Sequence, residues 1–236
     1  MQFLKPDEID VVILCGGVGA RLGAEMEGRP KPMVDINGKP FLDVLIEYVS
    51  SFGFNRFILC TGYKSKFIED YYRKKETTVQ FKISEEKKPL GTGGAIKNAE
   101  PLIQSDRFIA LNGDSFCQVS LVKLQEFHQK KNSLLSLVLS EVNETEDFGS
   151  VRLSKTNEIL EFEEKISSRK SVLVNAGIYF FETNLLSKIQ SGGKVSLEHD
   201  FFPSLVGKGI YGYVVKEKLF DIGTPERLSI ARNFFA

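Results

Sequence analysis

Residues 11–33 contain the feature that most constrains this chain, a short apolar run that leads directly into a glycine-rich loop. The run at residues 11–14 reads V-V-I-L; it is too short for a helix and rich in β-branched side chains, which predicts a strand buried on both faces. Three glycines follow at once: Gly16, Gly17 and Gly19. They leave room for backbone N–H groups to surround an anion, so the stretch predicts a strand that ends in a phosphate-binding loop.

Two cations accompany this loop. Arg21 carries a planar guanidinium group that can make paired hydrogen bonds with phosphate oxygens, and Lys31 carries a point charge. Two common glycine motifs are excluded, however. The dinucleotide fingerprint requires a third glycine where Leu22 stands, and the P-loop requires Gly-Lys-Ser/Thr where the chain reads Leu22-Gly23-Ala24.

Composition limits the classes of partner. The chain has 236 residues, of which 42% are hydrophobic and 26% charged, and this predicts one large α/β domain with a sizeable core. Its formal net charge is +0, so nothing favours a nucleic acid or an anionic membrane as partner, and any anion site must be local. The three cysteines show no metal-binding spacing, and no apolar run could span a bilayer. We therefore expect a soluble cytoplasmic protein.

Apolar strand-like runs alternate with amphipathic segments through the first half of the chain. The expected strands are residues 56–61, 79–83, 107–111 and 134–139, and the expected helices are residues 41–52, 65–72, 121–129 and a helix that opens near Gly91 and runs to Ala99. This alternation predicts a largely parallel sheet with crossover helices. Ligands of such sheets bind at the carboxyl ends of the strands, where the first loop, the Gly91 loop and Asp114 all fall.

The second half has a different pattern. Shorter and more polar strands are expected at residues 150–153, 159–163 and 172–181, and we interpret them as a lid of mixed or antiparallel pairing over the crevice. His128 is expected on the surface of its helix.

Several separated motifs resemble those of the sugar-1-phosphate nucleotidylyltransferases. The loop G-G-V-G-A-R-L followed by P-K-P-M is similar to the family signature G-G-x-G-T-R-L…P-K-P-M, with Ala20 where the family usually has Thr. The resemblance covers residues 10–234. It implies a Rossmann-like α/β/α sandwich with a mixed, mostly parallel central sheet and a small β-rich lid, the nucleotide-diphospho-sugar transferase type. Residues 1–236 would form one nucleotidyltransferase domain, with residues 1–8 as a short N-terminal extension.

Two of these motifs resemble the places where the family supplies carboxylates to a metal ion. They are L-N-G-D at residues 111–114 and F-D-I-G-T-P-E at residues 220–226. The resemblance implies that Asp114 and Asp221 bind Mg²⁺, which prefers one or two carboxylates together with substrate phosphates and water. The alternative is that both aspartates only cap turns after strands.

The sugar phosphate is assigned to two further motifs. In the family motif F-x-E-K, which F-E-E-K resembles, the Glu faces the sugar and the Lys its phosphate; here these would be Glu164 and Lys165. An exposed charged strand would read similarly. The motif N-A-G-I-Y matches the family and implies that Asn175 and Gly177 lie beside the sugar. The resemblance thus implies this catalytic set: Arg21, Lys31, Asp114, Lys165 and Asp221.

Nucleotide binding is assigned to the first loop and to the glycine-rich bend. The residues are Leu14, Gly16, Gly17, Gly19, Arg21, Glu86, Pro89, Gly91, Thr92 and Gly113. Glu86 precedes the bend where the family places a base-reading side chain. A carboxylate is an acceptor only and matches the adjacent N1–H and N2 amino donors of guanine, which predicts GTP. Glu86 could instead belong to an exposed run, E-E-K-K, and Glu85 is the next candidate.

Within the family, the motifs are most similar to those of D-glycero-α-D-manno-heptose 1-phosphate guanylyltransferases. The function implied is transfer of GMP from GTP to that heptose 1-phosphate, with release of pyrophosphate. One alternative is another sugar 1-phosphate, of mannose, glucose or N-acetylmuramate, with GTP, UTP, CTP or dTTP. The second is a non-catalytic regulatory protein that binds nucleotide sugars. The expected partners are thus the nucleotide and the sugar phosphate, without nucleic acid or membrane, and a homodimer is left open.

Overall fold

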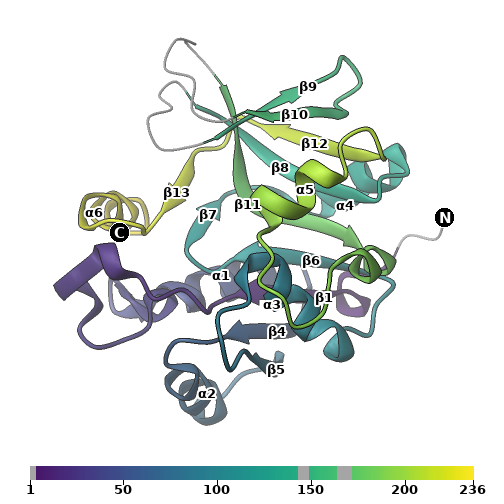
Figure 1. The fold of residues 1–236 in the computed structure, drawn as a ribbon. Helices are drawn as coiled ribbons and strands as arrows, with labels where there is room; N and C mark the ends of the chain where they lie inside the picture. Colours follow the sequence, from purple (N-terminus) through teal and green to yellow (C-terminus); the bar gives the residue numbers. More distant parts are fainter. Residues whose placement is uncertain (1–3, 143–148, 164–171) are drawn as a thin grey trace.

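A computed structural model describes residues 4–142, 149–163 and 172–236, and its centre is a nine-stranded mixed sheet (Figure 1). The strands are β1 (Asp10–Leu14), β4 (Arg56–Thr61), β5 (Gln80–Glu85), β6 (Arg107–Asn112), β8 (Leu135–Val142), β9 (Ser150–Leu153), β10 (Ile159–Glu163), β11 (Val172–Glu182) and β12 (Ile210–Val215). One path through the sheet runs β10-β9-β11-β6-β1-β4-β5, and β8 joins β11 to β12.

The four strands of the first half form the parallel part of the sheet. β1 pairs in parallel with β4 and β6, and β4 pairs in parallel with β5. The register sets Leu14 opposite both Cys60 and Asn112, so the carboxyl ends of three strands lie together. The expected parallel sheet is confirmed, and so is the convergence of its loops at one edge.

Alternate residues of β1 point to opposite faces of the sheet and bury different helices. Val11 and Ile13 pack in one core cluster with side chains of α1 (Phe41–Ser50), α2 (Ser65–Lys74) and α4 (Leu121–Lys131). Val12 packs on the other face with side chains of α3 (Gly91–Ala99), η5 (Thr183–Lys188), η6 (Leu197–Phe201) and α5 (Phe202–Ser204). Because strand side chains alternate, one buried strand holds both helical layers, which confirms the α/β/α sandwich.

The strands of the second half continue this sheet. β11 pairs antiparallel with β6 through its later residues and with β9 at Val174, and its other edge pairs with β8. β9 and β10 form an antiparallel pair, and β12 runs parallel to β8. The strands expected to form a lid are therefore part of the central sheet, joined to it through the long, mostly buried β11, and none of their described residues lines the pocket.

A third cluster ties the C-terminus to the N-terminal loop. It joins β7 (Ser115–Cys117), β13 (Leu219–Asp221) and α6 (Pro225–Phe234) to η2 (Ala20–Met26), with Leu22, Phe116 and Phe220 among its buried side chains. Figure 1 shows α6 beside the purple N-terminal segment. The remaining elements are η1 (Pro6–Glu8), η3 (Lys31–Met33), β2 (Asp35–Ile36), β3 (Lys39–Pro40) and η4 (Glu100–Leu102). None of the helices in the described ranges is long and apolar enough to cross a bilayer.

The surface position expected for His128 is wrong. Its side chain is buried, with Nδ1 2.9 Å from the Ser136 hydroxyl and Nε2 3.3 Å from the Glu182 carboxylate. His128 shares a helix face with the buried Leu121 and Leu124, because residues three, four and seven positions apart lie on one side of a helix. Burial lowers the pKa of His128 below its ordinary value, against the opposing effect of Glu182.

Candidate active site

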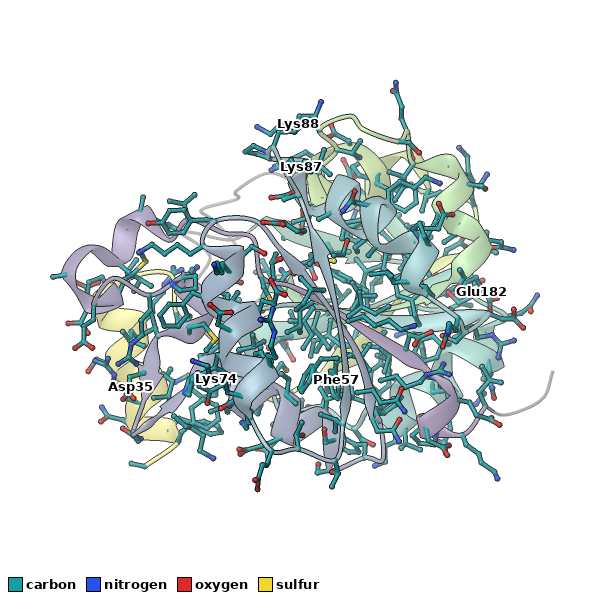
Figure 2. All side chains as sticks on the ribbon, turned by 90° about the horizontal axis from the view of Figure 1, so that it is seen from below. Asp35, Phe57, Lys74, Lys87, Lys88 and Glu182 are labelled. Carbon is teal, nitrogen blue, oxygen red and sulfur yellow. The ribbon has the colours of Figure 1, made fainter. Side chains whose placement is uncertain are left out.

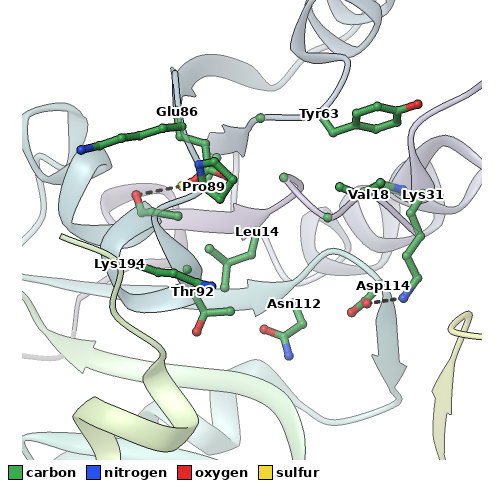
Figure 3. A pocket seen from close by; sticks show the side chains of 18 of the residues that line it. Leu14, Val18, Lys31, Tyr63, Glu86, Pro89, Thr92, Asn112, Asp114 and Lys194 are labelled. Atoms are coloured by element: carbon green, nitrogen blue, oxygen red, sulfur yellow. Dashed lines mark hydrogen bonds and ion pairs between the residues drawn. The ribbon is translucent and has the colours of Figure 1, made fainter. Parts of the chain in front are cut away.

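A pocket of about 630 Å³ opens at the carboxyl ends of β1, β4, β5 and β6 (Figure 3). Nine of the residues predicted from the sequence line it: Leu14, Gly16, Gly17, Lys31, Glu86, Pro89, Gly91, Thr92 and Asp114. They come from segments up to a hundred positions apart, and the parallel register brings them together. Glu86 lies toward one end of the pocket and the pair Lys31 and Asp114 toward the other (Figure 3).

An ion pair defines the second end. Lys31 Nζ donates to Asp114 Oδ2 at 2.5 Å, and the lysine is buried whereas the aspartate side chain is 41% exposed. Lys31 begins η3 between Pro30 and Pro32, whose fixed φ angles favour such a tight turn. Gly113 positions Asp114, because a Cβ at Gly113 would lie only 2.5 Å from the carbonyl oxygen of Leu14. Close packing thus explains why a glycine stands at position 113, which was predicted to bind the nucleotide.

Asp221 lies close to this ion pair because its strand is hydrogen-bonded to the segment that carries Asp114. The antiparallel pairing of β13 with β7 ends with Ile222 N donating to the Asp114 carbonyl at 3.0 Å. The Asp221 carboxylate accepts from Arg227 Nη1, at 3.2 Å to Oδ1 and 3.0 Å to Oδ2, and from Gly223 N at 2.8 Å. The two predicted metal ligands are therefore close in the fold, and each faces a cation.

Arg21 approaches the same turn from the N-terminal segment. It is exposed on η2, and a Cβ at Gly223 would lie 3.4 Å from its Nη2. Gly19, at φ +69°, caps the start of η2 and packs against Lys31: a Cβ at Gly19 would lie 2.9 Å from Lys31 Cβ. The two predicted phosphate cations thus share one loop.

The donor set fits a hard cation. Within residues 4–142, 149–163 and 172–236, no group of three His, Cys, Asp or Glu side chains could hold a metal ion by itself. Asp114 and Asp221 offer two carboxylates, which suits an ion that completes its shell with water and substrate phosphates. The ion pairs with Lys31 and Arg227 would have to rearrange around such an ion.

At the other end, the Glu86 carboxylate is held by one backbone donor. Its Oε2 accepts from Leu90 N at 2.9 Å, and its Oε1 lies against Gly62 and Gly16. A Cβ would lie 2.7 Å from Oε1 at Gly62 and 3.0 Å at Gly16, so both glycines provide room for this carboxylate. Glu85, the alternative, is exposed and outside the pocket lining.

A hydrogen-bond network supports the side of the pocket formed by Thr92. Its hydroxyl donates to Glu198 at 2.9 Å, and Glu198 also accepts from Ser196 at 3.0 Å and from Tyr179 at 3.3 Å. Asn175 Nδ2 donates to the Tyr179 hydroxyl at 2.8 Å. Burial, and then the Glu198 charge, raise the pKa of Tyr179 well above its ordinary value, so it remains a neutral donor.

Gly177 is required by close packing. Its φ is +72°, and a Cβ there would lie 2.7 Å from Ser115 Oγ and 2.8 Å from Asn112 Nδ2. The Gly177 N–H donates to Asn175 Oδ1 at 2.9 Å, which fixes the turn inside β11. The close neighbours of Gly177 are therefore protein side chains, whereas contact with a sugar stays a prediction.

Some residues that line the pocket were not predicted from the sequence, and two predicted residues lie where the structure gives no description. The missed lining residues with polar side chains are Tyr63, Lys87, Lys88, Asn112 and Lys194. Asn112 stands inside the L-N-G-D motif, and the lysines had only the signal of exposed charge. Glu164 and Lys165 lie outside the described residues.

Comparisons with known proteins identify the family of the chain. A family model described as "Nucleotidyl transferase" matches residues 10–236. D-glycero-alpha-D-manno-heptose 1-phosphate guanylyltransferase of Campylobacter jejuni is 33% identical over 218 residues, which cover 92% of this chain and 96% of that protein. Mannose-1-phosphate guanylyltransferase of Mycobacterium tuberculosis is 34% identical over 223 residues, but the chain spans only 62% of its length.

A solved structure extends the likeness to three dimensions. HddC from Yersinia pseudotuberculosis, complexed with GMP-PN, is 34% identical to this chain and superposes with a TM-score of 0.85. The match covers 97% of this chain and all of that one. Because the family model matches nearly the whole chain and the relatives match it in both sequence and fold, the chain belongs to the nucleotidyl transferase family of enzymes.

Proposed function

We propose that the chain transfers GMP from GTP to D-glycero-α-D-manno-heptose 1-phosphate and releases pyrophosphate. The observation that carries the proposal is the arrangement of one pocket, with Glu86 toward one end and Lys31 and Asp114 toward the other. The heptose assignment is supported by the Campylobacter relative, which the chain matches over nearly its whole length, and the guanine assignment by the HddC complex.

The reaction needs no general base. A sugar 1-phosphate has a second pKa of about 6 and is mostly dianionic at neutral pH, so its oxygen attacks the α-phosphorus of GTP without losing a proton. The new P–O bond forms as the bond from the α-phosphorus to the bridging oxygen breaks, and pyrophosphate leaves with the electron pair. Lys31 and Arg21 would offset the charge that develops on the phosphoryl oxygens.

Enzymes of this family generally use a divalent metal ion. We propose Mg²⁺ in this protein, held by Asp114 and Asp221. When bound, it would neutralise phosphate charge and align the nucleotide. Lys31 would then act both before and after the metal binds. Before substrates bind, it neutralises the charge of Asp114; once Asp114 binds the metal, the Lys31 ammonium group is available to a phosphate.

Glu86 supports the choice of guanine. Its Oε1 lies at the pocket wall between Gly16 and Gly62, while the Leu90 N–H holds its other oxygen. An acceptor held in this way matches the N1–H and N2 amino donors of guanine, whereas uracil and thymine offer one donor flanked by carbonyl groups that a carboxylate repels. The remaining sugar-site residues, Glu164 and Lys165, stay sequence predictions. Three free, buried cysteines fit the reducing cytoplasm, where we propose the enzyme acts.

The test is pyrophosphate release from a matrix of nucleotides and sugar 1-phosphates. GTP, UTP, CTP, dTTP and ATP would each be mixed with Mg²⁺ and with the 1-phosphates of heptose, mannose, glucose and N-acetylmuramate. We expect the highest kcat/KM for GTP with the heptose substrate. A higher value for mannose 1-phosphate would overturn the sugar assignment, and preference for a pyrimidine nucleotide would overturn the guanine assignment.

A further inference from the structure

The glycine-rich start of α3 is a docking surface for another segment of the chain. Val195 N donates to the Leu90 carbonyl at 2.8 Å, and Gly93 N donates to the Val195 carbonyl at 2.9 Å. A Cβ at Gly91 would lie 2.5 Å from the Val195 carbonyl oxygen, and one at Gly94 2.8 Å from that of Gly193. The close approach of residues 193–195 therefore explains why the run G-T-G-G has glycine at these positions.

This docking fixes where Lys194 lies. Gly193 and Val195, its two neighbours, contact the start of α3, and Lys194 itself lines the pocket. Figure 3 shows its side chain reaching over Thr92 toward Leu14. The other two unassigned pocket lysines, Lys87 and Lys88, lie at the edge of the molecule (Figure 2). Lys194 is thus the unassigned cation directed into the pocket.

Leu90 couples Lys194 to Glu86. The Leu90 N–H donates to Glu86 at 2.9 Å, and the Leu90 carbonyl accepts from Val195 N, next to Lys194. The two backbone groups of one residue therefore hold the Glu86 carboxylate and the backbone next to Lys194 at the same wall of the pocket. Such an arrangement presents an acceptor and a donor to one edge of a ligand.

We propose that Lys194 is a specificity residue that donates to O6 of the guanine base while Glu86 accepts from N1–H and the N2 amino group; this rests on the proposed function. Guanine carries the O6 acceptor directly beside these two donors. Adenine carries an amino group at that position, which an ammonium group disfavours. The pair would therefore select guanine over adenine as well as over pyrimidines.

The test measures nucleotide binding without the sugar phosphate. Lys194→Met keeps the length of the side chain and removes its charge, and Lys188→Met, on the exposed end of η5 outside the pocket lining, is the control. Binding of GTP, ITP and 2-aminopurine riboside triphosphate would be titrated with each protein, and binding of ATP and UTP would be measured alongside. ITP keeps O6 and N1–H, whereas the 2-aminopurine nucleotide lacks both.

We expect Lys194→Met to weaken GTP and ITP about tenfold each, the size of one hydrogen bond to a charged group, and to change binding of the 2-aminopurine nucleotide less than about twofold. Lys188→Met should match the wild type, and Lys194→Arg should retain most of the preference. An equal loss for all three nucleotides would mean that Lys194 meets ribose or phosphate and would overturn the inference, as would no loss at all.

Failure of the proposed function gives a separate result. If the wild-type protein bound GTP no more tightly than UTP, the guanine assignment itself would be wrong. If the wild type preferred GTP and Lys194→Met kept the full preference over ATP, only the role of Lys194 would be wrong.

Discussion

The two ends of the pocket are built from different kinds of contact. At the base end, Glu86 is held by the Leu90 N–H, a neutral backbone donor. At the reactive end, Asp114 faces Lys31 as an ion pair, and Asp221, next to it but outside the pocket lining, faces Arg227 in the same way. A carboxylate held by neutral donors keeps its charge for a ligand, whereas an ion-paired carboxylate must exchange partners when a metal or a phosphate arrives.

This difference separates selection from turnover. The base end is prearranged and should decide which nucleotide binds, with small effects on the rate of the chemical step. The reactive end meets charge that develops during the reaction and should decide the rate, with small effects on nucleotide choice. Substitutions at the two ends should therefore change different kinetic constants.

The largest effect is expected from the metal carboxylates. Asp114→Asn and Asp221→Asn each remove one negative ligand and keep the side-chain shape, so we expect kcat to fall about 10²- to 10³-fold, comparable to the loss of one transition-state contact. The melting temperature should stay close to that of the wild type. Steady-state kinetics over a range of Mg²⁺ concentrations checks this, and near-normal activity at low Mg²⁺ would remove the residue from the metal site.

Lys31→Met should have the next largest effect. Because Lys31 is proposed to offset developing charge, we expect kcat to fall about 10²-fold with little change in KM for GTP. Lys165→Ala, at a position known only from the sequence, should instead raise KM for the sugar phosphate. Steady-state kinetics with each substrate varied in turn separates the two; a change in nucleotide KM alone for Lys165→Ala would refute that pairing of roles.

At the base end, Glu86→Gln should alter preference more than rate. Glutamine keeps an oxygen that can accept from Leu90 N, but its amide donors would face the donors of guanine. We expect the preference for GTP over UTP to fall by roughly 1 to 3 kcal/mol, about 5- to 150-fold in kcat/KM. Glu85→Gln, on the exposed neighbour, is the matched control, and an unchanged preference in Glu86→Gln would clear Glu86 of this role.

The smallest effect is expected on the pH dependence of stability, from the buried His128 and its partner Glu182, away from the pocket. The folded-state pKa of His128 lies below its ordinary value of 6.5, because burial outweighs its contact with Glu182. As the pH drops, the imidazole of His128 is therefore protonated in the unfolded chain before it is protonated in the folded protein. The free energy of unfolding then falls as the pH drops from about 6.5 toward the folded-state pKa. Urea unfolding at pH 7.5 and 5.5 should show a smaller loss for His128→Gln than for the wild type; an equal loss would assign the effect to other groups.

Local patterns predicted the elements that a single segment determines. The strand expected at residues 56–61 is β4 (Arg56–Thr61), and the loop after β1 lies at the pocket as expected. A buried parallel strand and a glycine loop leave signals in adjacent residues. The convergence of the strand ends could also be predicted, because parallel strands connected by helices share one ligand-binding edge.

What depends on distant pairing could not be predicted. No periodicity indicates that β11 lies between β6 and β8, and the G-T-G-G run gives no sign that Val195 occupies its glycine surface. In the sequence alone, Lys194 has no feature that distinguishes it from other exposed lysines; its place at the pocket follows from the contact between Val195 and the start of α3. The burial of His128 is different, since its spacing from Leu121 and Leu124 was available in the sequence.

The most direct test of the separation is the ratio of kcat/KM for GTP to that for UTP, measured in the wild type, Asp114→Asn and Glu86→Gln. We predict that Asp114→Asn keeps the wild-type ratio although both of its rates fall, and that Glu86→Gln lowers the ratio while its kcat with GTP falls much less. If Asp114→Asn changed the ratio as much as Glu86→Gln does, the two ends of the pocket would not act separately, and the account would be wrong.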